Sequence, residues 1–247
     1  MPSAESQLRE EVCRIGRRLY DRGLAHATAG NISARLEDGF LITPTDAYLG
    51  ELDPAQLVKT DAQGGAQAAG PRPSKTLALH RRIYAVDAEA GAVIHTHSTH
   101  LVALTLERTV SMPQALIHAA AAMSLAPLPD LEHVPASFPD LLPPITPYFV
   151  MKVGHVPLLP YHQPGDPRVA DLVGALIAER RERGAPIRAL MLDRLGPNVW
   201  AATPAQACAV LEELEETAKL WRWSDPKPAP LDEAQIEELR EAFGARW

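Results

Sequence analysis

Apolar residues recur along the chain at two different spacings, and these spacings define the predicted elements. A helix over residues 6–21 is predicted by apolar positions three or four residues apart, namely Leu8, Val12, Ile15 and Leu19. One further helix begins within residues 101–106, and the others are predicted over residues 73–85, 167–183, 204–223 and 231–243. Ser74 can cap the helix over 73–85, and Thr203 with Pro204 begins the helix over 204–223.

Short apolar runs between small or turn-forming residues predict the strands. These runs cover residues 31–35, 39–45, 92–95, 149–151, 156–161 and 189–192. The first run follows a turn of small residues, which allows the backbone to approach a ligand closely. Because strands alternate with helices, the predicted fold class is α/β, with helices packed against a central mixed β-sheet.

The stretch from residue 110 to residue 144 has no clear periodicity. It begins rich in alanine, becomes rich in proline, and contains His118, Glu132 and His133. We interpret it as an insertion or a lid within one domain that spans residues 1–247, a length that one hydrophobic core can support.

Composition narrows the class of protein. Apolar residues make up 46% of the chain and charged residues 22%, which is typical of a globular protein. No apolar run approaches the roughly 20 residues that span a bilayer, and the polar N-terminus lacks the apolar core of a signal peptide. A net charge of −7 gives no electrostatic basis for nucleic-acid binding. We therefore expect a cytoplasmic protein without a membrane or nucleic-acid partner, with a small-molecule substrate and with Cys13 and Cys208 reduced.

Residues 92–100 contain the candidate metal ligands. An apolar run leads into His95 and His97, and alternate side chains of a strand lie on one face. Neutral imidazole is a common ligand of zinc, and a catalytic zinc site uses about three protein ligands and one open position. His95 and His97 can therefore share a divalent metal ion. Taken alone, the pattern is more typical of solvated or hydrogen-bonded histidines at a strand end.

A series of short motifs supports the metal-binding interpretation. In chain order they read T-A-G-N-I-S, I-T-P-T, R-P-S-K, H-T-H-S-T, V-P-L-L-P-Y, P-G-D, L-G-P-N-V and L-E-E-L-E-E-T-A-K. Together they resemble the class II aldolase/adducin family over nearly the whole chain. The P-S-K, P-G-D and L-E-E-T-A-K patterns are most similar to its branch of 3-oxo-tetronate 4-phosphate decarboxylases.

The resemblance implies a divalent metal ion held by three histidines, of which His95 and His97 match two. Zinc is the expected ion, with manganese and iron as alternatives. The family's third histidine lies in an Asn-His-Gly-Pro turn, where this chain has Leu195, and its acid/base glutamate is replaced by Thr76. Leucine binds no metal, and threonine titrates far above neutral pH. The resemblance also implies a homotetramer with sites assembled between neighbouring subunits.

The family's anion pocket implies that the substrate anion is surrounded by Asn31, Thr45, Ser74 and Lys75. Asp46 occupies a position that is usually glycine, and its charge would repel a phosphate. Asn31 and Ser74 also have purely structural interpretations, because asparagine forms turns and serine caps helices.

The third metal ligand and the proton donor require other residues. His162 is the ligand that we expect, because it follows the strand over 156–161 at a turn, where side chains tend to face clefts. His155 and Asp193 are alternatives. Tyr148 is the candidate acid, acting across a subunit boundary, and a packed tyrosine is its structural alternative. His80 is interpreted as a core histidine that donates to a backbone carbonyl, and the acidic run 212–216 as a solvated helix face.

The expected function is a metal-dependent carbon–carbon lyase, nearest to the sugar-acid phosphate decarboxylases. Decarboxylation survives the loss of the glutamate better than aldol cleavage does, because it requires an electron sink but no base to remove a hydroxyl proton. Two alternatives are an enzyme of the same fold with altered chemistry, such as an oxygenase or a lyase on another acid, and a non-catalytic binding protein that lost the site.

Overall fold

The computed structural model describes residues 2–66, 70–109 and 138–247. Within them, one mixed sheet has the strand order β3-β2-β1-β4-β7-β6-β5. The strands are β1 (Asn31–Leu36), β2 (Gly39–Ile42), β3 (Val58–Asp61), β4 (Ala92–His95), β5 (Leu158–Leu159), β6 (Ala189–Leu192) and β7 (Gly196–Ala201). Neighbouring strands are antiparallel except β5 and β6, which are parallel. The predicted α/β class with a central mixed sheet is confirmed.

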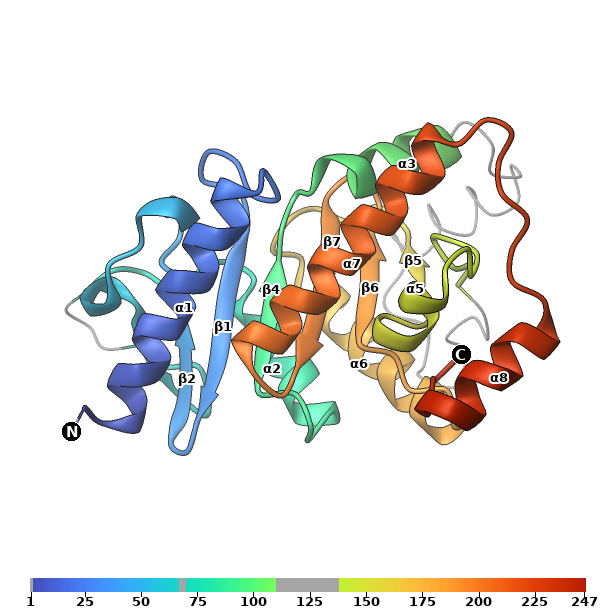
Figure 1. The fold of residues 1–247 in the computed structure, drawn as a ribbon. Coiled ribbons are helices and arrows are strands. Elements are labelled where there is room, and N and C mark those ends of the chain that lie inside the picture. Colours follow the sequence, from blue (N-terminus) through green and yellow to red (C-terminus); the bar gives the residue numbers. More distant parts are fainter. Residues whose placement is uncertain (1, 67–69, 110–137) are drawn as a thin grey trace.

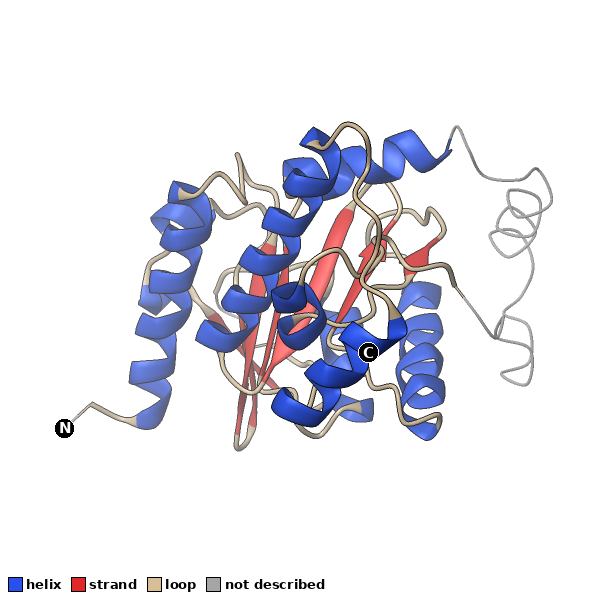
Figure 2. Ribbon diagram, turned by 45° about the vertical axis from the view of Figure 1, so that its right-hand side comes forward, coloured by secondary structure: helices blue, strands red, loops and turns tan. Residues whose placement is uncertain are grey.

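Helices cover both faces of the sheet (Figures 1 and 2). On one face lie α1 (Ala4–Asp21), α3 (Thr99–Thr109), α5 (Pro147–Lys152), α7 (Pro204–Trp223) and α8 (Glu233–Phe243). On the other face lie α2 (Leu77–Val86) and α6 (Pro167–Glu182). Two separate apolar cores result, because alternate strand residues point to opposite faces. Ile94 packs in the core under α1 and α7, whereas Val93 packs in the core under α2 and α6.

Several boundaries agree closely with the sequence patterns. The predicted helices over 6–21, 167–183 and 204–223 correspond to α1, α6 and α7, and the predicted strand over 189–192 is β6. Thr203 caps α7 as expected, since its side chain accepts a hydrogen bond from the Gln206 amide. Both cysteines are free thiols, as predicted.

Other predictions were wrong. Residues 149–151 are not a strand but belong to α5, where Thr146 and Pro147 repeat the cap-and-proline signal of α7. Helix α5 has only six residues, which are too few to show the helical spacing of apolar positions. The helix predicted over 73–85 begins at Leu77, because the amide of Ser74 donates to the Thr43 carbonyl and keeps this segment beside the strand end. The sequence patterns did not predict strands β3 and β7.

The acidic run in α7 is not simply a solvated face. Glu215 is only 6% exposed, and its carboxylate accepts hydrogen bonds from the backbone amides of His100 and Leu101 in the first turn of α3. The Nδ1 atom of His100 lies 2.8 Å from the same carboxylate. Glu212 forms ion pairs with Arg18 and Arg22. These residues fasten α7 to its neighbours.

Two further expectations concern the extent of the fold. Of the predicted insertion or lid at 110–144, residues 110–137 lie outside the described residues. His118, Glu132 and His133 fall in this part. Across the described part of the chain, no helix combines the length and apolar character needed to cross a bilayer.

Candidate active site

The T-A-G-N turn and the end of β4 meet at His95. Gly30 adopts φ = +93°, and a side chain there would come within 2.8 Å of the His95 carbonyl oxygen. Only glycine therefore allows this turn to pass so close to the strand. In the sheet, His95 pairs directly with Asn31 of β1 and with Asn198 of β7. Directly paired residues of antiparallel strands share a face, so these three side chains form one row facing α2 and α6.

His95 is buried with one ring nitrogen fixed. Its Nδ1 atom lies 2.8 Å from the backbone oxygen of Pro197, and because a carbonyl oxygen only accepts, Nδ1 carries the hydrogen. The Nε2 atom then carries a free lone pair, which is the form that binds a metal ion. Burial lowers the pKa of His95 to about 4, with a further contribution from His97, so the ring is neutral at physiological pH.

His97 lies just beyond the end of β4 and beside two other imidazoles. Its ring centroid is 5.1 Å from that of His95 and 6.3 Å from that of His26, which follows α1. Burial and the neighbouring His26 lower the pKa of His97. Sequence reasoning missed His26. The available signal was its place just before the T-A-G-N turn, which packs against the end of the His95 strand.

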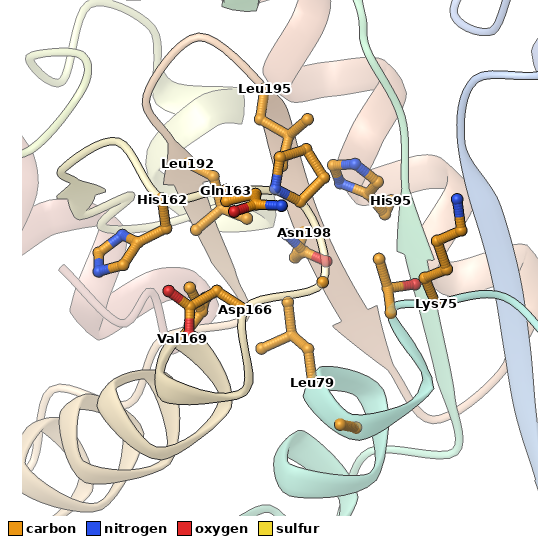
Figure 3. Close-up of a pocket in the computed structure, with 14 residues that line it drawn as sticks. Lys75, Leu79, His95, His162, Gln163, Asp166, Val169, Leu192, Leu195 and Asn198 are labelled. Atoms are coloured by element: carbon orange, nitrogen blue, oxygen red, sulfur yellow. The ribbon is translucent and has the colours of Figure 1, made fainter. Parts of the chain in front are cut away.

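An open pocket lies next to His95, between β7 and the N-terminal ends of α2 and α6 (Figure 3). Lys75, Thr76, His162 and Leu195 are among the residues that line it. The positions that hold glutamate and histidine in the family thus do face the pocket. Here they provide a hydroxyl group and an apolar side chain.

The pocket brings His162 to the same site as His95 but not into contact with it. Figure 3 shows His162 on the opposite side from His95, with Asn198 between them and the His162 ring directed away. The Nδ1 atom of His162 lies 2.7 Å from the Pro160 oxygen, so it donates its hydrogen there and leaves Nε2 free.

The anion-binding candidates come from three adjoining segments. Thr45 and Ser74 are brought together because the Thr45 amide donates to the Arg72 carbonyl and the Ser74 amide to the Thr43 carbonyl. Ser74 does not cap α2, since its side chain approaches Thr76 instead. Lys75 lines the pocket, and Asn31 lies beside His95 in the sheet.

Asp46 occupies a left-handed backbone conformation, with φ = +57°. Glycine adopts such values freely, and aspartate tolerates them better than most residues. The backbone thus has the conformation for which the family's usual glycine is suited, although the chain carries a carboxylate there.

Tyr148 lies away from this pocket. It is 57% exposed on α5, which packs against α7 and α8 on the opposite face of the sheet from α2 and α6. It lines a different cavity, together with Lys152 and Arg188. Within one chain, therefore, Tyr148 does not face the pocket beside His95.

Other histidines have local structural partners. His155 contacts Asp140 through Nδ1 at 2.6 Å and stacks on Trp247. His80 is buried, as predicted, but its Nδ1 atom hydrogen-bonds to the Ser33 hydroxyl at 2.7 Å rather than to a backbone carbonyl. Burial lowers the pKa of His80 to about 3.

The donor set fits a divalent metal ion only in part. His95 and His97 present neighbouring imidazoles, and the free Nε2 atom of His95 suits an ion. Within residues 2–66, 70–109 and 138–247, however, no group of three or more His, Cys, Asp and Glu side chains is arranged to hold a metal. A third ligand would have to move into place or come from another chain.

Comparisons with known proteins agree with the fold and the motifs. The family model described as the class II aldolase and adducin N-terminal domain matches residues 10–222. A 3-oxo-tetronate 4-phosphate decarboxylase of Cupriavidus necator is 51% identical over 250 residues, covering 99% of this chain and 100% of the relative. One from Escherichia coli K12 is 36% identical over 96% of each chain.

Solved structures give the same picture. The crystal structure of YgbL from Escherichia coli matches with a TM-score of 0.76 and 35% identity, covering 96% of this chain and all of that one. An L-fuculose 1-phosphate aldolase matches with a TM-score of 0.74 at 21% identity, covering 99% of this chain and 98% of the other, which shows a shared fold.

Proposed function

The chain belongs to the class II aldolase and adducin family, and from this premise we propose that it is a metal-dependent decarboxylase of a four-carbon sugar-acid phosphate, 3-oxo-tetronate 4-phosphate or a close analogue. The observation that carries the proposal is the 51% identity to a decarboxylase of that name over essentially the full length of both chains. The pocket beside His95 is the proposed site.

The reaction makes modest demands on the protein. The substrate is a β-keto acid, so the bond between C1 and C2 breaks, C1 leaves as carbon dioxide, and the electron pair passes into the C3 carbonyl. C2 then gains one proton. A group that stabilises negative charge on the C3 oxygen is essential, whereas a base is not. Thr76 in place of glutamate is compatible with this chemistry.

Charge stabilisation is the role we assign to a divalent ion, zinc or alternatively manganese or iron, which when bound would act as a Lewis acid. His95 and His97 would hold it, because both are neutral and adjacent. Two histidines compete for the third position. His162 lines the pocket, and His26 lies beside His97. We favour His26 over His162 as the third ligand, because its ring centroid lies 6.3 Å from that of His97. Either histidine would have to rotate its side chain to reach the ion.

We assign substrate binding to Lys75, which lines the pocket, and to three polar residues of adjoining segments. Asn31, Thr45 and Ser74 offer hydrogen bonds to the phosphate, and the Lys75 ammonium offers a positive charge. In this proposal, the charge of Lys75 also offsets the negative charge of Asp46. The segments that carry these two residues lie side by side, because the backbones of Thr43 and Thr45 form hydrogen bonds with those of Ser74 and Arg72.

We assign the protonation of C2 to Tyr148 of a neighbouring subunit or to water. Because Tyr148 is exposed on the far face of its own sheet, it can act only if another copy presents it. A role for Tyr148 therefore requires an oligomer, and a homotetramer is the form that we propose from the family. Two free cysteines are consistent with the reducing cytoplasm that we propose as its location.

Leu195 and Thr76 favour a second candidate function. Both line the pocket, where Leu195 offers no metal ligand and Thr76 offers no carboxylate base. A protein that binds a sugar-acid phosphate without converting it would have the same fold and anion-binding residues.

One assay separates the two. Purified protein is given 3-oxo-tetronate 4-phosphate, generated in the assay, and carbon dioxide release is followed with added zinc, manganese or iron. We expect turnover by the wild type, with His95→Ala reduced to the spontaneous rate. Binding of the substrate without release above that rate would overturn the decarboxylase and leave the binding protein.

A further inference from the structure

Asn198 lies beside His95 in the row of paired side chains that crosses the sheet. Its backbone pairs with His95 of β4 on one side and with Leu190 of β6 on the other. Its side chain lines the pocket, between His95 and His162 (Figure 3). None of the roles assigned above uses this residue.

The carboxamide of Asn198 is buried and without partners. The residue is 0% exposed, and neither its Oδ1 nor its Nδ2 atom forms a hydrogen bond with any described residue. A buried polar group without a partner destabilises the fold, and such groups are rare in native proteins. An apolar residue would be the stable choice at this position, as Leu190 next to it illustrates.

The position of the unpaired amide indicates what would satisfy it. It faces the pocket and adjoins the histidine whose Nε2 atom is free. A ligand that spans this point needs an oxygen that can accept from Nδ2. The substrate of the proposed function has such oxygens in its C1 carboxylate, C2 hydroxyl, C3 carbonyl and phosphate, and among these negative charge develops on the C3 oxygen during the reaction.

We propose that Asn198 is a catalytic residue whose Nδ2 group donates a hydrogen bond to the C3 oxygen of the substrate. The inference rests on the proposed function and adds a residue to it. Preorganised donors stabilise the negative charge that develops on such an oxygen as carbon dioxide leaves. In this chain, the amide would supply part of the stabilisation at a site whose usual third histidine is replaced by Leu195.

The decisive variant is Asn198→Leu, which has nearly the same volume and no polar atoms. The matched control is Thr60→Val on β3, because the Thr60 hydroxyl is also buried and unpaired among the described residues but does not line the pocket. Turnover, metal content and the melting temperature of the metal-free protein are measured for both variants and the wild type.

We expect both variants to melt at a higher temperature than the wild type, because each loses an unpaired polar group. Only Asn198→Leu should lose turnover, by about 10²- to 10³-fold in kcat with a smaller change in KM, as for other single oxyanion donors. Its metal content should not change, which separates a donor to the substrate from a metal ligand.

Unchanged kcat in Asn198→Leu would overturn the inference and leave the decarboxylase standing. Loss of metal together with turnover would also overturn it, since Asn198 would then be a ligand. A wild type that neither turns over nor binds the substrate would instead overturn the proposed function, and this inference with it.

Discussion

The backbone oxygen of Pro197 accepts a hydrogen bond from Nδ1 of His95 and so fixes the orientation of its imidazole. Pro197 belongs to the segment in which Leu195 replaces the family's third histidine. Gly196 keeps this segment close, because a side chain there would lie 1.9 Å from the Thr96 carbonyl oxygen. The segment therefore lacks that histidine but still positions His95, one of the proposed ligands.

This arrangement predicts which histidines hold the metal. His95→Ala and His97→Ala should each abolish binding of one equivalent of zinc per chain, measured by elemental analysis after dialysis. Because the ring centroid of His26 lies 6.3 Å from that of His97, whereas the His162 ring is directed away from His95 in Figure 3, we expect His26→Ala to weaken zinc binding about 10- to 100-fold and His162→Ala to have little effect.

His155→Ala serves as the control, since that side chain is engaged with Asp140 and Trp247. Loss of zinc in His162→Ala but not in His26→Ala would show that the third ligand is His162. Full zinc occupancy in His97→Ala would contradict the site altogether.

Asp46 should limit the affinity for phosphorylated ligands. Asp46 directly follows Thr45, whose segment is held beside Ser74 by backbone hydrogen bonds, and removing a like charge near a bound phosphate is expected to improve binding about three- to tenfold. Asp46→Asn tests the charge alone, because asparagine also tolerates the left-handed conformation at φ = +57°. Asp46→Gly should bind at least as well.

Inorganic phosphate and the substrate are suitable titrants for calorimetry. If both variants bind phosphate with the same affinity as the wild type, the Asp46 carboxylate does not face the bound anion, and the proposed anion-binding residues are wrong at this position.

His80 should make the fold sensitive to acid. Burial lowers its pKa from 6.5 to about 3, so the unfolded chain takes up a proton below pH 6.5 while the folded chain does not. The free energy of unfolding therefore falls as the pH drops, by about 2 kcal/mol from this residue between pH 7 and pH 5. His80→Gln should remove that share of the pH dependence.

Urea denaturation of the metal-free protein at the two pH values measures the effect. An equal loss of stability in His80→Gln and the wild type would show that the ring is protonated, or exposed, in the folded protein.

The sequence predicted the helices whose apolar faces run for several turns, α1, α6 and α7, because each face packs against the sheet along its length. It failed for α5, whose six residues are too few to show a periodicity, and for β7, which begins with the turn-forming residues Gly196 and Pro197. The motifs located His95 and the pocket, because Gly30 and Gly196 allow their segments to approach the backbone of His95 and Thr96 closely. They did not reveal His26 or Asn198, whose proximity depends on how separate strands and loops meet.

Tyr148 provides a test of the assembly. Because it is exposed on the opposite face of the sheet from the His95 pocket, a working site would combine His95 of one subunit with Tyr148 of the next. His95→Ala and Tyr148→Phe should each be nearly inactive alone. When the two variants are unfolded, mixed in equal amounts and refolded together, about a quarter of the sites in the mixed oligomers would regain both residues. We therefore expect about a quarter of wild-type turnover, with light scattering used to confirm that the mixed species is an oligomer. Full turnover of Tyr148→Phe alone would place Tyr148 outside the chemistry and leave water as the proton donor, whereas no recovery in a mixture of normal mass would show that the site is not shared between subunits.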